Sequence, residues 1–474
     1  MRFGILFCTL TLLTLTSGNF AHASQFLPAL TYPLHDTPHG LATADFNGDG
    51  NLDIAIPNYP DSGNDNYVAV FLGNGDGSFK VSVNYSLGAA PYDIAVGDLN
   101  GDGKLDIVTA NQVSYDVLLG NGDGTFRTSS DNAVAYAATN LILADFNHDG
   151  ILDLVFCGTD QVSTAEVLLG NGDGTFGFAS SFPTGGRNVS ALTAADLNGD
   201  GALDLAFAHM GVTTVLFGHG DGTFGTPSVY QSGVPSYRIL ARDLNQDGDL
   251  DLVTALVHPG PMVYLNNGDG TFAPGVVYDI GLGEAFDVAV ADMNADSLAD
   301  LVVTDQGGTF NLLFGRGNGT FTRALQYDAE TGSQYLNIAD YNNDGHPDLA
   351  ITAFFTLGEV IDDLQIFRNT GDLTPVVDLN PTSLRFPATF VGQHSHPQQF
   401  LLRNHGPSVL TIANVTVSGD FTQQSHCAKT VGIGQRCNFS VTFTPTATGR
   451  RDGEVTIVTS DGSHYTEELS GIGK

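Results

Sequence analysis

The 474-residue sequence predicts an all-β protein, a seven-bladed β-propeller followed by an immunoglobulin-like β-sandwich. Three observations support this prediction. A nine-residue motif of the form DxNxDGxxD occurs seven times, and short apolar runs rich in β-branched and aromatic residues flank each copy. The motifs stop near Pro375, and about a hundred residues of short alternating runs and turns follow. We find no convincing helical pattern in the sequence.

The repeats predict the propeller. Successive motifs are 47 to 53 residues apart, and they start at Asp45, Asp98, Asp145, Asp196, Asp243, Asp292 and Asp340. A turn signature such as GNGDGTF follows each of the first six motifs, and Asn-Gly and Asp-Gly between apolar runs are strong hairpin signals. Each repeat therefore contains four strands. Four-stranded units at this period are typical of a β-propeller, which covers the faces of its sheets by radial packing.

The ends of the repeat region predict how the ring closes. The seventh repeat lacks its last strand, and the segment QFLPALTYP from Gln25 resembles TFAPGVVYD from Thr271. We expect residues 24–34 to supply the missing outer strand. The predicted domains are a signal peptide at 1–23, a propeller at 24–374 and a sandwich at 375–474.

The N-terminus and the cysteines predict an extracellular protein. Arg2, a short apolar run and the small residues Ala21 to Ala23 form the pattern of a cleaved signal peptide. We see no later run that could span a membrane, so the mature protein is expected to be secreted, either free or at the cell surface. An oxidising compartment allows a disulfide between Cys427 and Cys437, whereas Cys157 reads as a small buried hydrophobe.

The charge excludes one class of partner. The chain has 52 acidic and 17 basic residues, a net charge of −35, so binding to nucleic acid is not expected. Such an excess of carboxylates is expected where bound metal ions offset it.

The nine-residue motif predicts a calcium site. Positions 1, 3, 5 and 9 are Asp, Asn, Asp and Asp in all seven copies, and position 6 is glycine in six of them. Calcium takes about six to eight oxygen ligands, and a tight loop can direct such side chains to one centre. An EF-hand is excluded because position 12 is never Glu and the flanks read as strands. The alternative is that Asp, Asn and Gly only form turns, which does not explain the aspartate at position 9.

The predicted shell uses side chains 1, 3, 5 and 9 and the carbonyl of residue 7, for up to seven calcium ions. Its members are, loop by loop, Asp45, Asn47, Asp49, Asn51 and Asp53; Asp98, Asn100, Asp102, Lys104 and Asp106; Asp145, Asn147, Asp149, Ile151 and Asp153; Asp196, Asn198, Asp200, Ala202 and Asp204; Asp243, Asn245, Asp247, Asp249 and Asp251; Asp292, Asn294, Asp296, Leu298 and Asp300; and Asp340, Asn342, Asp344, His346 and Asp348. The sixth loop has Ser297 in place of glycine, at a cost of about 1 kcal/mol if this position needs a positive φ, and we expect the weakest affinity there.

Residues 26–373 resemble the FG-GAP and VCBS repeats of integrin-α-like propellers, on the DxNxDGxxD spacing and on GAAPYDIAVGDLNGDGKLDIV from Gly88. This resemblance implies a seven-bladed propeller with calcium in loops between the first two strands of its blades. The segments NPTSLRF, LRNHGPSVLTI and FTPTATG resemble the choice-of-anchor D or ASPM/SPD-2/hydin-type domains. That resemblance implies a spacer or attachment domain, with Cys427 and Cys437 matching the paired cysteines of that family.

The face opposite the metal loops is the candidate region for binding a ligand. Six residues before each motif lie His39, Tyr92, Thr139, Ser190, Tyr237, Phe286 and Gln334. If they form a ring at the mouth of the channel, His39, Tyr92, Tyr237 and Phe286 are candidate ligand-binding residues. The alternative is that they pack blade against blade.

Two classes of function remain open. The first is an extracellular binding or adhesion module for a protein or glycan that the sequence does not identify. The second is a carbohydrate-active enzyme, such as a polysaccharide lyase or hydrolase. No HExxH or GxSxG motif occurs and tryptophan is absent, so the sequence favours a binding module without catalytic residues.

Overall fold

The computed structural model describes residues 25–474 except 35, 60–65, 128–129, 159–162, 282, 323, 330–331, 356–360, 372–376, 382, 405 and 407. The 37 elements of the described residues are all β-strands. Within these residues no helix has the length and apolarity needed to cross a bilayer. The expected signal peptide, residues 1–23, lies outside the described residues.

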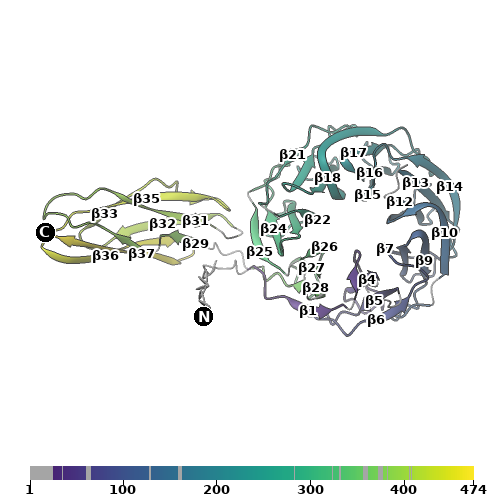
Figure 1. The fold of residues 1–474 in the computed structure, drawn as a ribbon, viewed down its shortest axis with the longest axis horizontal. Helices are drawn as coiled ribbons and strands as arrows, with labels where there is room; N and C mark the ends of the chain where they lie inside the picture. Colours follow the sequence, from purple (N-terminus) through teal and green to yellow (C-terminus); the bar gives the residue numbers. More distant parts are fainter. Residues whose placement is uncertain are drawn as a thin grey trace, which may run out of the picture.

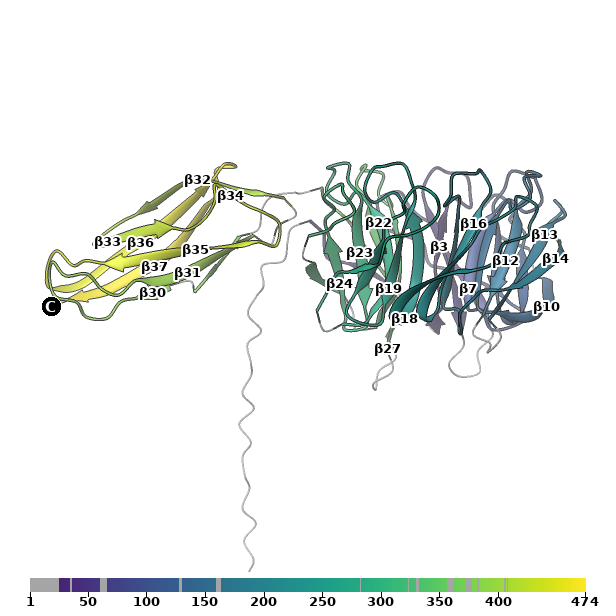
Figure 2. The same ribbon diagram turned by 90° about the horizontal axis from the view of Figure 1, so that it is seen from above.

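The strands of the repeat region stand around a central axis as a propeller, shown in Figure 1 along the axis and in Figure 2 from the side. Each of the seven motifs joins the innermost strand of its repeat to the next strand; in the first repeat the innermost strand is in two pieces, β2 and β3, which both pair with β4. We number the repeats by their motifs. The first three contain β2 (Thr37–Pro38), β3 (Ala42–Ala44), β4 (Asp53–Tyr59), β5 (Tyr67–Phe71) and β6 (Val83–Ser86); β7 (Asp93–Gly97), β8 (Asp106–Ala110), β9 (Gln112–Leu118) and β10 (Ser130–Ala138); and β11 (Asn140–Ala144), β12 (Asp153–Cys157), β13 (Thr164–Gly170) and β14 (Phe176–Pro183).

Repeats 4 and 5 share one continuous strand. Their strands are β15 (Ala191–Ala195), β16 (Asp204–Ala208), β17 (Met210–Leu216), β18 (Ser228–Arg242), β19 (Asp251–Leu256), β20 (Pro261–Tyr264) and β21 (Val276–Val277). The first half of β18 pairs with β17 as an outer strand, and its second half pairs with β19 as an inner strand. The two sheets are therefore joined into one of seven strands.

The N-terminal strand completes the last sheet. Repeat 6 contains β22 (Ala285–Ala291), β23 (Asp300–Asp305), β24 (Thr309–Leu313) and β25 (Leu325–Asp328); repeat 7 contains β26 (Ser333–Ala339), β27 (Asp348–Phe355) and β28 (Ile361–Phe367). The fourth strand of repeat 7 is β1 (Leu30–Pro33), which pairs antiparallel with β28 and aligns Leu30 with Ile366. Both ends of the repeat region thus lie in one sheet.

The propeller core lies between neighbouring sheets. The second strands β8, β12, β16, β19 and β23 are buried along their whole length, and so are β5 and β20 in repeats 1 and 5. Between repeats 1 and 2, for example, Val68 and Val70 pack with Ile107 and Leu118. This face-to-face packing leaves the first strands to line the central channel.

The C-terminal part is a two-sheet sandwich. One sheet has the order β29-β31-β35-β33 and the other β30-β37-β36-β32-β34. The strands are β29 (Val377–Asn380), β30 (Ser383–Arg385), β31 (Gln398–Asn404), β32 (Leu410–Val417), β33 (Phe421–Ser425), β34 (Thr430–Val431), β35 (Arg436–Phe443), β36 (Gly449–Thr459) and β37 (His464–Gly473). The all-β prediction of a propeller followed by an immunoglobulin-like domain is confirmed.

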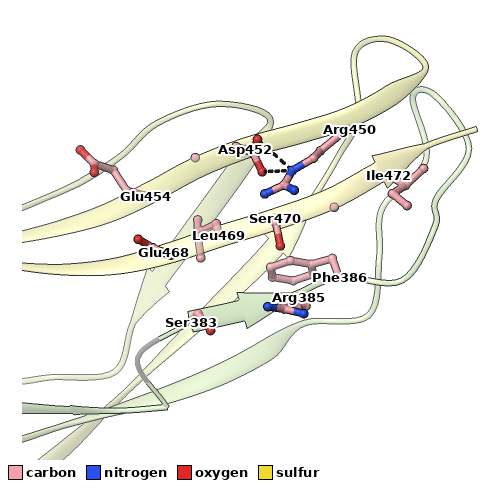
Figure 3. Close-up of a pocket in the computed structure, with 12 residues that line it drawn as sticks. Ser383, Arg385, Phe386, Arg450, Asp452, Glu454, Glu468, Leu469, Ser470 and Ile472 are labelled. Carbon is pink, nitrogen blue, oxygen red and sulfur yellow. Dashed lines mark hydrogen bonds and ion pairs between the residues drawn. The ribbon is translucent and has the colours of Figure 1, made fainter.

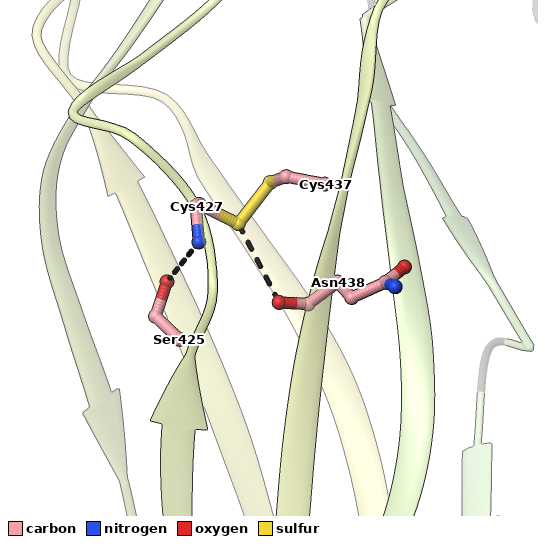
Figure 4. The surroundings of a disulfide bond; sticks show 4 residues. All are labelled: Ser425, Cys427, Cys437 and Asn438. Atoms are coloured by element: carbon pink, nitrogen blue, oxygen red, sulfur yellow. Dashed lines mark hydrogen bonds between the residues drawn. A yellow bond between two sulfur atoms is a disulfide. The ribbon is translucent and has the colours of Figure 1, made fainter.

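The cysteines behave as the sequence predicts. Cys427 and Cys437 form a disulfide that ties the segment after β33 to β35, next to Ser425 and Asn438 (Figure 4). Cys157 is fully buried at the end of β12 and is not part of a disulfide.

Candidate functional site

The motif loops are closed by their own side chains. In the first loop the Asp45 carboxylate accepts hydrogen bonds from the backbone amides of Gly48 and Gly50, the Asn47 side-chain oxygen accepts one from Asp49, and Asp49 accepts one from Asn51. The bond from the amide of position 6 to the aspartate at position 1 is present in all seven loops, at 2.7 to 3.1 Å. The side chains predicted as ligands therefore lie on the inner side of each loop.

Position 6 has the left-handed backbone that the sequence suggested. The six glycines there have φ between 79° and 93°, and Ser297 in the sixth loop has φ 67°. Position 4 also has a positive φ in every loop, including at Ala295, which the sequence analysis did not anticipate. The sixth loop thus holds two non-glycine residues in a conformation that costs each about 1 kcal/mol.

The aspartate at position 9 has a structural role that the sequence analysis missed. It is fully buried in all seven repeats. In the first repeat, Asp53 accepts hydrogen bonds from the amides of Phe46 at position 2 and of Gly73 in the turn signature. The equivalent bonds from position 2 measure 2.8 to 3.1 Å and those from the turn 2.7 to 2.9 Å across the repeats. Position 9 therefore connects each motif loop to the turn of the same repeat.

The turns connect neighbouring repeats. The amide of Gly124 in repeat 2 donates to the carbonyl of Phe46 in repeat 1, and Gly77 in repeat 1 donates to Tyr341 in repeat 7. The same contact joins Gly174 to Leu99, Gly222 to Phe146, and Gly319 to Leu244. The motif loops and turns thus form an interlocked belt on one face of the ring.

The electrostatics of the loops suit a divalent cation. Burial raises the pKa of every position-9 carboxyl group, and the nearby carboxylates at positions 1 and 5 raise it further. The pKa reaches about 6 for Asp204 and about 7 for Asp300 and Asp348. The aspartates of one loop therefore repel each other, and a bound cation would relieve this repulsion. The carboxylate and carboxamide oxygens match the ligands that calcium prefers.

Two further observations concern the loops. Among the described residues, no three His, Cys, Asp or Glu side chains are arranged as a metal-binding group. The oxygens at positions 1 and 5 are directed at backbone amides instead. In the second loop a cation is already near, because the Lys104 ammonium lies 3.7 Å from a carboxylate oxygen of Asp102.

The opposite end of the channel carries an arc of six half-buried aromatic residues: Tyr92, Tyr59, His39, Tyr335, Phe286 and Tyr237. His39 lies between Tyr92 and Tyr335, with ring centroids 5.3 and 6.5 Å away. Phe286 contacts Tyr335 at 5.5 Å and stacks on Tyr237 at 5.0 Å. We call this set the aromatic arc.

The arc contains all four candidate ligand-binding residues of the sequence analysis. His39 and Tyr92 meet at one end, and Tyr237 and Phe286 meet at the other. Sequence reasoning missed Tyr59, which packs against His39 and Tyr92, and Tyr335, which joins the two pairs. The other residues at the same register do not belong to the arc. Ser190, for example, donates a hydrogen bond to the carbonyl of Ala208.

Charged residues line the channel next to the arc. The channel forms a cavity of about 490 Å³ whose walls include Asp93, Arg238 and Asp287. Asp93 accepts amide hydrogen bonds from Ile94 and from Leu141 of the next repeat. Asp287 is bonded in the same way to Val288 and Leu336. These two carboxyl groups therefore also connect neighbouring sheets.

Arg238 contacts Asp287 and interacts electrostatically with Asp93. Its Nε is 3.3 Å from an Asp287 oxygen, and 43% of its side chain is open to the channel. Burial raises the pKa of both Asp93 and Asp287, while the Arg238 guanidinium acts in the opposite direction. Tyr335 interacts electrostatically with all three residues. Through Tyr335 the arc therefore lies within electrostatic reach of the charges in the channel.

A second hollow lies on the sandwich (Figure 3). It has a volume of about 640 Å³ on the outer face of β30, β36 and β37. Its charged side chains have both signs, and Arg450 donates to both carboxylate oxygens of Asp452. This pairing leaves no single charge preference in the hollow.

The comparisons with known proteins agree with this architecture. Six overlapping segments match the FG-GAP-like repeat: 62–109, 98–156, 145–207, 196–254, 243–303 and 292–351. Residues 37–71 match the FG-GAP repeat, so together these matches cover more than half of the chain. The chain belongs to the FG-GAP-like repeat family. Residues 375–471 match the HYDIN/CFA65/VesB-like, Ig-like domain.

Solved structures resemble the fold of this FG-GAP-like protein. The crystal structure of BBS1N in complex with ARL6DN aligns with a TM-score of 0.53 at 11% identity, over 74% of this chain and 100% of that one. An Agrocybe aegerita lectin specific for non-reducing terminal N-acetylglucosamine aligns at 0.47 with 23% identity, over 62% and 81%. The V. cholerae biofilm matrix protein Bap1 aligns at 0.46 with 12% identity, over 73% and 91%. A comparison with curated protein sequences gave no match.

Proposed function

We propose that this protein is a secreted, calcium-stabilised propeller that binds an extracellular protein or glycan at the aromatic arc. The observation that carries the proposal is the convergence of six half-buried rings at the end of the channel away from the motif loops. Aromatic rings offer large contact areas at a low entropic cost, and they serve both glycan and protein recognition. The disulfide fits an oxidising, extracellular compartment.

The motif loops have a different task in this proposal. Calcium, held by the side chains at positions 1, 3, 5 and 9 and by the carbonyl of residue 7, would neutralise the carboxylates of the belt. The chain's own hydrogen bonds then transmit the rigidity of each loop to the turn and to the neighbouring repeat. The arc keeps its geometry because the sheets that present it are fixed at the opposite face.

Thermal unfolding with calcium and with excess EDTA, together with elemental analysis, tests the metal component. We expect up to seven calcium ions per chain and a lower melting temperature in EDTA. Asp102→Asn should remove one ion and leave the others. An unchanged melting temperature and no bound metal would show that the motifs are turns and not calcium sites.

Screening the calcium-loaded full chain on glycan and extracellular-protein arrays tests the binding component. We expect binding that Phe286→Ala and Tyr92→Ala both weaken. Phe178→Ala is the matched control, because Phe178 is an exposed aromatic residue on the outer strand β14. If both arc variants bind every array ligand as well as the control does, the arc is not the ligand site.

A further inference from the structure

We propose that the aromatic arc recognises a basic side chain, the ammonium of a lysine or the guanidinium of an arginine on a partner protein. This inference rests on the function proposed above and names the chemical class of its ligand. Three features of the described residues carry it: the electron-rich rings, the carboxyl groups beside them and the cation that the chain itself places there.

The arc gathers five benzenoid side chains and one imidazole, all half-buried, at one end of the channel. A cation over such a ring is attracted by its quadrupole, by roughly 0.5–1 kcal/mol at an exposed site and more where water is excluded. Neighbouring rings of the arc have centroids 5.0 to 6.5 Å apart, so several rings lie within a short distance of one another. Aromatic cages for cationic groups are built on this principle.

The mouth also carries acidic groups. Asp93 and Asp287 line the channel within electrostatic reach of Tyr335, and Glu284 lies within reach of Tyr237. Asp93 and Asp287 each accept two backbone amides, an arrangement that suits a carboxylate. The channel wall also includes Arg238 and Arg242, so the long-range attraction of a cation comes from the strongly acidic charge of the whole chain.

Arg238 shows that the site accommodates a cation. Its guanidinium lies against Asp287, near Asp93 and Tyr335, with 43% of the side chain open to the channel. It belongs to the chain, so it occupies part of the acidic pocket and competes with an incoming basic group. A cavity of about 490 Å³ leaves room for a second extended basic side chain beside it.

Fluorescence anisotropy with a labelled hexalysine peptide, on the calcium-loaded full chain, tests the inference. We expect binding of hexalysine and at least about tenfold weaker binding of its Nε-acetylated form, because acetylation removes the charge. Phe286→Ala should weaken hexalysine binding about two- to fivefold, as expected for the loss of one cation–π contact. Equal binding of the acetylated peptide would overturn the inference.

Two pairs of variants separate this site from general attraction to an acidic protein. Glu284→Gln at the mouth should weaken binding by about threefold, whereas Asp76→Asn, the same charge change in a turn on the opposite face, should not. Arg238→Gln should strengthen binding by about three- to tenfold because it removes the competing cation, whereas Arg242→Gln, at the other end of the channel wall, should not. If both members of a pair act alike, or if Arg238→Gln abolishes binding, the inference fails.

The array screen and a glycan probe distinguish a failure of this inference from a failure of the proposed binding function. Array ligands that lack basic groups but depend on Phe286 would overturn the inference and leave the binding function intact. A glucosamine hexamer that binds where hexalysine does not would overturn the choice of a protein partner. An array without any arc-dependent ligand would overturn the proposed function itself.

Discussion

Glu467 offers a test of the energetics of the sandwich. It lies on β37 with its side chain in the core, and its exposed fraction is 0%. Within the described residues neither of its carboxyl oxygens has a hydrogen-bond partner. Burial raises its pKa from 4.5 to about 7, and the negative charge of the adjacent Glu468 adds to this effect. We predict that Glu467→Gln stabilises the sandwich at neutral pH and not at acidic pH.

The sign and size follow from linkage. Below about pH 4.5 the group is protonated in both states and contributes nothing to the pH dependence. Between about pH 4.5 and 7 the unfolded chain loses this proton while the folded chain keeps it, so the free energy of unfolding falls as the pH rises. Above about pH 7 the loss levels off. The shift from 4.5 to about 7 corresponds to at most about 3.5 kcal/mol, since one pKa unit is about 1.4 kcal/mol.

The assay is urea unfolding of the full chain, followed by circular dichroism between pH 4 and 8. The difference in stability between the wild type and Glu467→Gln isolates this group, since every other titrating group is common to both. We expect a difference near zero at pH 4 that grows to about 2–3 kcal/mol at pH 8. Glu468→Gln, on the exposed face of the same strand, should give a smaller gain in the same direction, because it removes only the lesser cause of the raised pKa of Glu467. A difference that does not depend on pH would refute the account of a buried, neutral glutamate.

Three further predictions concern the propeller belt and the sandwich. Asp106→Asn should destabilise the propeller by about 1–3 kcal/mol even in EDTA, because the side-chain amide nitrogen cannot accept one of the two buried backbone hydrogen bonds. Asp102→Asn should destabilise it only when calcium is present. Urea unfolding with calcium and with EDTA distinguishes the two variants, and equal effects in EDTA would contradict the structural role of position 9. Gly124→Ala should lower the melting temperature and the free energy of unfolding, the latter by about 1–3 kcal/mol. The reason is that φ is 81° at this position and an added Cβ would lie 2.8 Å from a Leu72 methyl group. An unchanged melting temperature would contradict the close approach of the turn to repeat 1. Replacing Cys427 and Cys437 by serine should destabilise the sandwich by about 3 kcal/mol, because the disulfide closes a loop ten residues long and so lowers the entropy of the unfolded chain. Thermal unfolding measures this change. An unchanged melting temperature would show that the disulfide does not constrain the unfolded chain.

The repeat pattern predicts most of the fold because one local rule recurs seven times. Each motif forms one turn and each turn signature forms another. Because these turns are short, each strand within a repeat pairs antiparallel with the strand that follows it in the sequence. The joining of repeats 4 and 5 through β18 was not predictable in this way. No local signal distinguishes a strand that ends from one that continues into the next sheet.

The candidate site was predictable only in part. The sequence places His39, Tyr92, Tyr237 and Phe286 at equivalent positions, and their contacts follow from the ring. Tyr59 ends a second strand and Tyr335 lies one residue out of this register, so only the folded ring brings them to the arc. The second role of position 9 was missed for the same reason. Its partner amide lies 14 to 21 residues further along the chain and meets it only through strand pairing.

The pairing of β1 with β28 has a mechanical consequence. The strands are antiparallel, and the chain enters and leaves this pair at the same end, where the amide of Thr370 donates to the carbonyl of Gln25 and Phe26 bridges to Asn369. Tension between the segments that flank the ring would break these hydrogen bonds one after another rather than all at once. The other sheets of the ring are joined by covalent connections. The ring therefore has one defined opening point under load, and it lies beside the segment that leads to the sandwich.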